Sequence, residues 1–125
     1  MHKGKIENRG FKRPLLATRY TMAGLKAAWV HEEAFRLEII AAAMLIPTAL
    51  WVGRTAVEMS LLIGSCLIVL ITELLNSSIE AVVDRIGTEH NELSGRAKDL
   101  GSAAVFCSLV LTILVWSFIV FERWL

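Results

Sequence analysis

The sequence has few cysteines, and they do not form a recognisable pattern. Its two cysteines, Cys66 and Cys107, both lie in apolar runs, and neither has a second Cys or a His at the spacing of metal ligands. Two isolated thiols of this kind argue against a disulfide framework and against a zinc site. We expect both to be packing residues.

The sequence also lacks an excess of charge of either sign. Its 13 Lys and Arg balance 12 Asp and Glu, and charged residues make up only 20% of the chain. No basic strip with interleaved aromatic residues compensates for this balance, so we exclude nucleic acid as a partner. The first 13 residues are polar and lack the apolar core of a secretory signal. Membrane insertion is therefore expected from internal segments.

What the sequence has in abundance is apolar residues, at 55% of the chain. Residues 100–121 form an uncharged run of 22, which is long enough to cross a bilayer, whereas the runs 39–53 and 59–72 need extension to do so. We predict an all-α integral membrane protein and a single domain over residues 1–125. Its membrane helices are expected at about 34–53, 57–86 and 98–121. The second of these helices is predicted to end at Gly87. A polar, glycine-punctuated loop over 87–102 is expected to follow it and to lead into the third helix.

The basic residues predict the orientation in the membrane. Eleven of the 13 fall in residues 1–36 and 85–98, which places these segments and the N-terminus in the cytoplasm. Residues 14–35 form a further helix with an apolar stripe of Thr18, Met22, Leu25 and Trp29. We favour an amphipathic surface helix over an ordinary cytoplasmic helix, because Trp29 and Tyr20 suit the headgroup zone.

Four polar side chains share one face of the second membrane helix. Glu73, Asn76, Glu80 and Asp84 fall within an arc of roughly 80° at about 100° per residue. A carboxylate at membrane depth is costly, which makes Glu73 a functional candidate and a candidate general base. Glu80 and Asp84 could instead be an ordinary solvated helix end.

A second acidic cluster lies at residues 31–38, where the surface helix meets the first membrane helix. Its carboxylates Glu32 and Glu38 join Glu73 and Glu80 at one side of a small bundle, and like charges so arranged favour a hard cation such as Mg²⁺. Lys98 could neutralise a phosphate or simply reach to the interface. Gly101 and Ser102 suit close helix packing. No Walker A or kinase-type glycine loop is present.

Three segments, 24–29, 73–85 and 92–104, resemble the bacterial integral-membrane diacylglycerol kinase family in order and spacing. The resemblance implies a homotrimeric, multi-pass enzyme of the bacterial inner membrane, with membrane lipids around it and its active site on the cytoplasmic side. It also implies transfer of the ATP γ-phosphate to diacylglycerol, giving phosphatidic acid and ADP, with Mg²⁺ as cofactor.

Carried onto this chain, the resemblance assigns residue roles. Glu73 is implied as the proton acceptor and Asn76 as an orienting group, with Glu32 and Glu80 as metal ligands. The implied ATP-binding residues are Arg13, Tyr20, Glu32, Glu80, Glu89, His90, Asn91, Lys98 and Asp99. The implied lipid contacts are Arg13, Thr18, Lys26, Trp29, Phe35, Glu38, Trp51 and Ser102. Leu37, Thr72 and His90 depart from residues frequent in Gram-negative members, but they flank the implied catalytic residues.

Three other functions remain open at this point. Some relatives of the family phosphorylate undecaprenol, another lipid alcohol. A small proton-coupled transporter would use Glu73 as a proton relay, but it leaves Asn76, Glu80, Lys98 and Asp99 without a role. A membrane scaffold without catalytic activity fails for the same reason.

Overall fold

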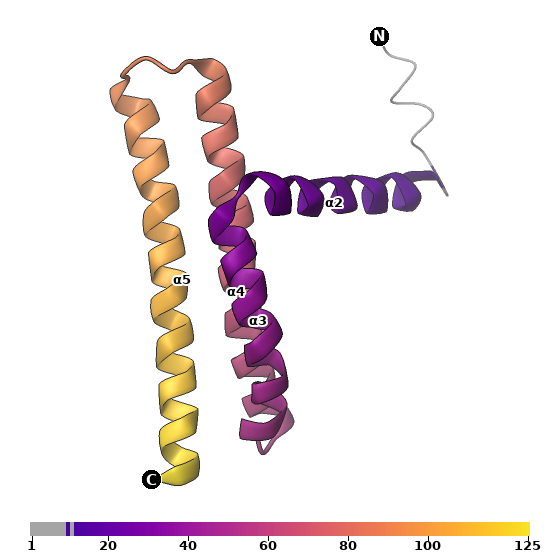
Figure 1. Cartoon of the computed structure of the whole chain (residues 1–125), viewed down its shortest axis with the longest axis vertical. Coiled ribbons are helices and arrows are strands. Elements are labelled where there is room, and N and C mark those ends of the chain that lie inside the picture. Colours follow the sequence, from indigo (N-terminus) through magenta and orange to yellow (C-terminus); the bar gives the residue numbers. More distant parts are fainter. Residues whose placement is uncertain (1–9, 11) are drawn as a thin grey trace. The chain divides into compact units, whose positions relative to one another are not determined.

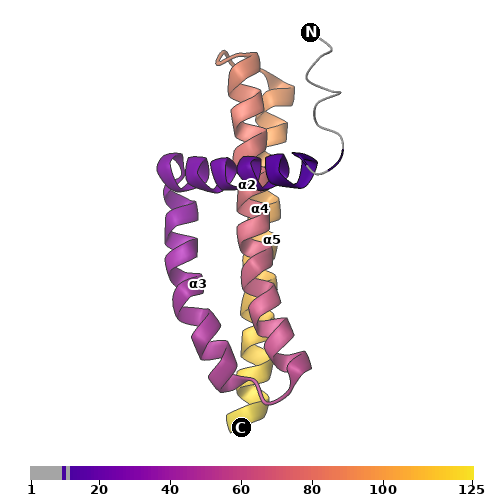
Figure 2. The ribbon, with the colours of Figure 1, turned by 90° about the vertical axis from the view of Figure 1, so that its right-hand side faces the viewer.

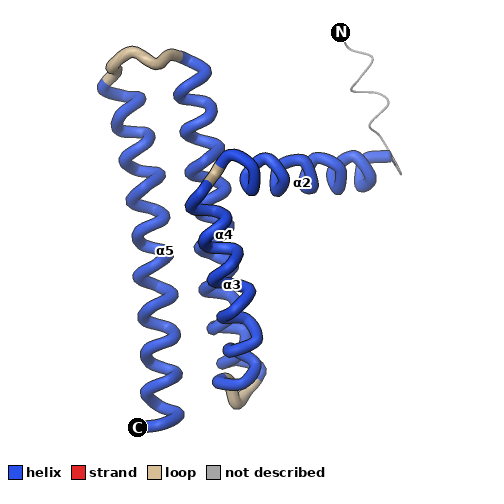
Figure 3. The backbone as a smooth tube through the Cα atoms, viewed as in Figure 1, coloured by secondary structure: helices blue, strands red, loops and turns tan. Residues whose placement is uncertain are grey.

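The computed structural model describes residues 10 and 12–125, and within them it contains helices and no strand (Figure 3). The helices are α2 (Lys12–His31), α3 (Glu33–Val52), α4 (Ala56–Ile86) and α5 (Glu92–Trp124). Three of them, α3 to α5, are long and apolar enough to cross a membrane, which confirms the predicted fold class. The basic residues Lys3, Lys5 and Arg9, which contribute to the predicted orientation, lie outside the described residues.

The chain folds as two compact units, the first ending at Glu33 and the second comprising Ala34–Leu125. In the first unit, α2 carries Pro14 in its first turn. A missing backbone N–H costs nothing there, because the first N–H groups of a helix have no partner within the helix. The apolar stripe predicted on this helix is exposed at Met22, Leu25 and Trp29. An exposed apolar stripe beside charged residues is the pattern expected of a helix that lies on a lipid surface.

Capping residues set the bounds of α4. Thr55 accepts a hydrogen bond from the Glu58 N–H, and the Glu58 carboxylate accepts one in return from the Thr55 N–H, a reciprocal capping box. At the other end, the Gly87 N–H donates to the Val83 carbonyl. The prediction of one long helix ending at Gly87 is confirmed.

The predicted loop over residues 87–102 is wrong beyond residue 91. Asn91 accepts hydrogen bonds from the Leu93 and Ser94 N–H groups and thereby starts α5 at Glu92. An N-cap of this kind satisfies two of the backbone donors that a helix start leaves free. The third membrane helix therefore begins before the predicted residue 98, and Lys98, Asp99, Gly101 and Ser102 all lie on it, as its predicted range of about 98–121 implies.

The helices α4 and α5 form an antiparallel hairpin along most of their length (Figures 1 and 2). Two hydrogen bonds join them at membrane depth: Thr112 Oγ1 donates to the Ser65 carbonyl at 3.0 Å, and Trp116 Nε1 donates to the Leu62 carbonyl at 3.3 Å. Fixed partners at two heights define the register of the hairpin, and this register decides which residues of α5 face the polar stripe of α4.

The helix α3 joins this hairpin through a small core near the Gly53 turn. Ala49, Val52, Leu62 and Ile119 are buried there together. Trp51 also contacts Trp124, with ring centroids 5.4 Å apart. Elsewhere many large apolar side chains of α3 to α5 are exposed, as expected for surfaces that face lipid.

Candidate functional site

The polar stripe of α4 runs from a buried end to an exposed end. Glu73 and Asn76 are 6% and 8% exposed, Glu80 is half-buried, and Asp84 is exposed. Because α4 has 31 residues, it is about 46 Å long, whereas a bilayer's hydrocarbon core is roughly 30 Å thick. The change from buried to exposed along the stripe fits a passage from apolar surroundings to water.

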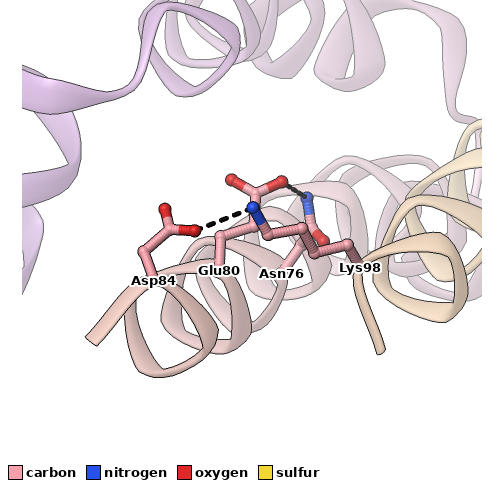
Figure 4. Close-up of polar contacts among 4 residues, drawn as sticks. All are labelled: Asn76, Glu80, Asp84 and Lys98. Carbon is pink, nitrogen blue, oxygen red and sulfur yellow. Dashed lines mark hydrogen bonds and ion pairs between the residues drawn. The ribbon is translucent and has the colours of Figure 1, made fainter. Parts of the chain in front are cut away.

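Asn76 and Glu80 contact one another, as predicted from their spacing on one helix face. Asn76 Nδ2 donates to Glu80 Oε1 at 3.5 Å, a long hydrogen bond between side chains one turn apart (Figure 4). Asn76 Oδ1 is buried and has no hydrogen-bond partner. The site therefore holds a polar atom that no other group in the described chain satisfies.

Lys98 of α5 pairs with Asp84 of α4 across the hairpin. Lys98 Nζ lies 2.8 Å from Asp84 Oδ1, and the two side chains are 43% and 58% exposed (Figure 4). Asp84 is exposed, as in an ordinary solvated helix end, and it is also paired with Lys98. The pair brings the lysine to the polar end of the stripe and leaves more than a third of its side chain accessible to a ligand.

Glu38 of α3 lies near Glu73 of α4. The two carboxyl groups are close enough to interact electrostatically, and one oxygen of Glu38 is buried without a hydrogen-bond partner. Glu38 also lines an apolar cleft of about 90 Å³ formed by α3, α4 and α5. The other lining residues are Ala41, Ala42, Leu45, Cys66, Val69, Leu109 and Thr112.

The donor atoms of the site suit a hard divalent cation. Among the described residues, no group of three or more His, Cys, Asp and Glu lies close enough together to hold a metal. Glu80 accepts one long hydrogen bond from Asn76 and lies near the Lys98 ammonium group, so its carboxylate keeps lone pairs available to a cation. Carboxylate oxygens of this kind, together with water and phosphate oxygens, are what Mg²⁺ prefers. Glu32 belongs to the first unit and is half-buried.

The other predicted site residues are distributed over all four helices. Arg13, Thr18, Tyr20, Lys26 and Trp29 are exposed on α2. Glu89 and His90 are exposed between α4 and α5, Asn91 caps α5, and Asp99 and Ser102 are exposed on α5. On α3, Phe35 is buried and Trp51 is exposed against Trp124.

Two features of the site were not predicted from the sequence. One is the pairing of Lys98 with Asp84, and the other is the close approach of Gly101 on α5 to the Asn76 side chain on α4. Both depend on the register between α4 and α5, which Thr112 and Trp116 help to set. A pattern of side-chain donors on an apolar helix, two of them one turn apart, is the signal that could have suggested this register.

Comparison with known proteins gives a consistent result. The family model of prokaryotic diacylglycerol kinase matches residues 19–120. The chain is 46% identical over 114 residues to a diacylglycerol kinase of Escherichia coli K12, covering 91% of this chain and 93% of the relative. It is 52% identical over 105 residues to a diacylglycerol kinase of Haemophilus influenzae, covering 84% and 89%. A Helicobacter pylori diacylglycerol kinase is 43% identical over 108 residues, covering 86% and 84%.

Proposed function

The chain belongs to the prokaryotic diacylglycerol kinase family, and from this premise we propose how its residues carry out the reaction. It is a bacterial membrane enzyme that transfers the γ-phosphate of ATP to diacylglycerol, giving phosphatidic acid and ADP. Such a reaction joins a lipid that stays in the bilayer to a nucleotide that stays in water. The stripe on α4, which passes from a buried to an exposed environment, fits this requirement.

Glu73 is the proposed general base. The lipid hydroxyl must lose a proton as its oxygen attacks the γ-phosphorus, and a carboxylate can accept that proton while the bond to ADP breaks. Glu73 lies at the buried end of the stripe on α4, and the lipid hydroxyl is proposed to reach it from the bilayer. Asn76, one turn further along, orients the reacting groups through its carboxamide.

The nucleotide is proposed to bind at the exposed end of the stripe. Lys98 places a positive charge there, and such a charge stabilises phosphate oxygens as negative charge shifts during transfer. Glu32 and Glu80 would hold Mg²⁺, which when bound supplies further charge neutralisation at the phosphates. The remaining nucleotide contacts are proposed at Arg13, Tyr20, Glu89, His90, Asn91 and Asp99.

The lipid is proposed to approach along α2 and the apolar faces of the membrane helices. Thr18, Lys26 and Trp29 offer polar and aromatic contacts on one helix. Phe35, Glu38, Trp51 and Ser102, together with Arg13, complete the proposed lipid contacts. The enzyme is proposed to lie in the inner membrane. Its N-terminus and active site are proposed to face the cytoplasm, because 11 of its 13 basic residues fall in residues 1–36 and 85–98 and basic segments favour that side.

A homotrimer is proposed as the active assembly. A single set of three membrane helices buries Glu73 but leaves Glu38 and Glu80 partly exposed, whereas charged groups in membranes face a bundle interior. Further copies of the chain would supply the missing walls.

The observation that carries the mechanism is the burial of Glu73 at one end of the polar stripe. The substitution Glu73→Gln tests whether this carboxylate is the general base. The substitution keeps size and hydrogen bonding but removes the base, so we expect turnover to fall by roughly 100-fold or more while ATP affinity is retained. The assay uses labelled ATP in mixed micelles and offers diacylglycerol and undecaprenol side by side. Turnover of diacylglycerol within about tenfold of wild type would show that Glu73 is not the base.

Glu58→Gln is the matched control for this experiment. Glu58 lies at the opposite end of α4 and acts in the capping box, where glutamine serves as well. The control should keep wild-type turnover, which separates loss of the base from loss of a glutamate in the same helix.

A further inference from the structure

A single glycine of α5 lies against the Asn76 side chain. Gly101 is buried at this point, and a Cβ atom placed on it would overlap Asn76 Oδ1 and lie 3.2 Å from Asn76 Cγ. Heavy atoms that are not bonded to each other do not overlap in this way in proteins. Only a hydrogen atom therefore fits between the α5 backbone and the carboxamide.

The carboxamide has different surroundings at its two ends. Its nitrogen donates to Glu80 Oε1, whereas its oxygen is buried, faces Gly101 and has no hydrogen-bond partner. An unpartnered buried oxygen gains nothing from a directional bond, so packing has to define its position. A glycine Cα–H group is also a weak donor that suits a carbonyl oxygen at close range.

From this contact we propose that Gly101 is a positioning residue, which keeps the Asn76 carboxamide turned toward Glu80 by allowing the α5 backbone to approach it. The inference rests on the proposed roles of Asn76 and Glu80. A side chain at position 101 would either rotate the carboxamide or push α4 and α5 apart. Both movements break the contact between Asn76 Nδ2 and Glu80 Oε1.

The other glycines inside helices α4 and α5 do not share this constraint. No heavy atom lies within 4 Å of a Cβ placed on Gly95 of α5 or on Gly64 of α4. Within a helix, glycine is otherwise less favourable than alanine, so a requirement for glycine at position 101 has to come from the neighbouring side chain. Gly95 supplies a control on the same helix.

The test is a double-substitution cycle in the full-length, micelle-solubilised enzyme. The variants are Gly101→Ala, Asn76→Ala, the two combined, and Gly95→Ala as the control. For each, kcat, the KM for ATP and the thermal unfolding midpoint are measured. We expect Gly101→Ala to lower kcat by roughly 10- to 100-fold, because small displacements of catalytic groups have effects of this size. Gly95→Ala should stay within about twofold of wild type.

The decisive comparison is made in the Asn76→Ala background. If the added methyl group acts through Asn76, Gly101→Ala changes kcat there by no more than about twofold, since the carboxamide is already gone. An equal loss of kcat in both backgrounds would overturn the proposal, as would a Gly101→Ala enzyme within about twofold of wild type.

The thermal unfolding midpoints distinguish an error in the proposed role of Gly101 from an error in the proposed role of Asn76. If Asn76→Ala alone keeps wild-type turnover, the proposed role of Asn76 is wrong, and the contact is then judged from the unfolding midpoints of the cycle. A midpoint lowered by Gly101→Ala only when Asn76 is present supports the contact, and additive midpoints overturn it. If Gly101→Ala does not fold, recovery of folded protein in the double variant supports the proposal, and its failure to fold overturns it.

Discussion

Lys98 illustrates how one side chain can have both a structural and a chemical partner. Its ammonium group pairs with Asp84 while both residues remain largely accessible to water. Exposed ion pairs contribute little to stability, so a strong effect of substitution on catalysis would have to come from another partner. The proposed partner is the nucleotide phosphate.

We therefore predict that Lys98→Met lowers turnover by roughly 100-fold, as expected for the loss of a group that stabilises developing charge. Its unfolding midpoint should stay close to that of wild type. Asp84→Asn is the matched comparison, because it removes the ion pair and leaves the lysine in place. Equal losses of turnover in the two variants would mean that Lys98 acts through the ion pair and not through the phosphate.

At the same scale, Glu32 and Glu80 are predicted to bind one Mg²⁺ together. Glu32→Ala and Glu80→Ala should each raise the Mg²⁺ concentration that gives half-maximal activity, and added metal should partly rescue at least one of them. The measurement is a metal titration of both variants. Glu122→Ala is the control, because Glu122 lies near the C-terminal end of α5, far along the helices from Glu80. Unchanged midpoints in both variants would contradict a shared ion.

At the scale of the helix, Asn91 has a capping role that is separable from its proposed nucleotide contact. Asn91→Ala removes the acceptor for the Leu93 and Ser94 N–H groups, which should lower the free energy of unfolding by about 1 kcal/mol. Asn91→Ser keeps an N-cap and should remain near wild-type stability. Chemical unfolding of the two variants measures this difference.

The same pair of variants reports on ATP. If the asparagine side chain contacts the nucleotide, both variants lose ATP affinity although only one loses stability. A loss of affinity that follows stability alone would leave Asn91 as a cap and remove it from the nucleotide site.

The helices also show what the sequence could predict and what it could not. The end of α4 at Gly87 was predictable because glycine is a strong local signal, and the shared face of Asn76 and Glu80 follows from helix geometry alone. The first two turns of α5 are polar and contain Gly95, and this pattern predicts a loop. Good helix formers such as Glu92, Leu93 and Ala97, together with the cap at Asn91, outweigh that single glycine.

The contacts between helices could not be predicted from the sequence, for a different reason. The Lys98 pair with Asp84 and the Gly101 contact with Asn76 depend on how far α5 is shifted along α4. Apolar surfaces in lipid are nearly uniform, so the hydropathy pattern does not specify that shift. Close packing and a few hydrogen bonds such as that of Thr112 specify it instead.

At the scale of the whole molecule, we predict that the active site is shared between subunits. The proposed base and one proposed metal ligand, Glu32, belong to different compact units of the chain. If the Glu73 stripe of one copy meets the surface helix of a neighbour, a mixture of Glu73→Gln and Glu32→Ala subunits should recover part of the lost activity. Some interfaces in such a mixture combine two intact halves.

The measurement requires co-assembled subunits whose mixing is verified by crosslinking, with each inactive variant alone as the control. Recovered turnover above either variant supports a shared site. Verified mixed oligomers without any activity would show that each site is built within one chain.

The length of α4 has a consequence for how the two products leave. About 20 of its 31 residues suffice to cross the hydrocarbon, and the Thr55 turn fixes one end, so Glu80 and Asp84 reach past the acyl chains. Phosphatidic acid then departs sideways within a two-dimensional phase, while ADP diffuses away in three dimensions. Inhibition by ADP should therefore follow its concentration in solution, whereas inhibition by phosphatidic acid should follow its mole fraction among the surrounding lipids.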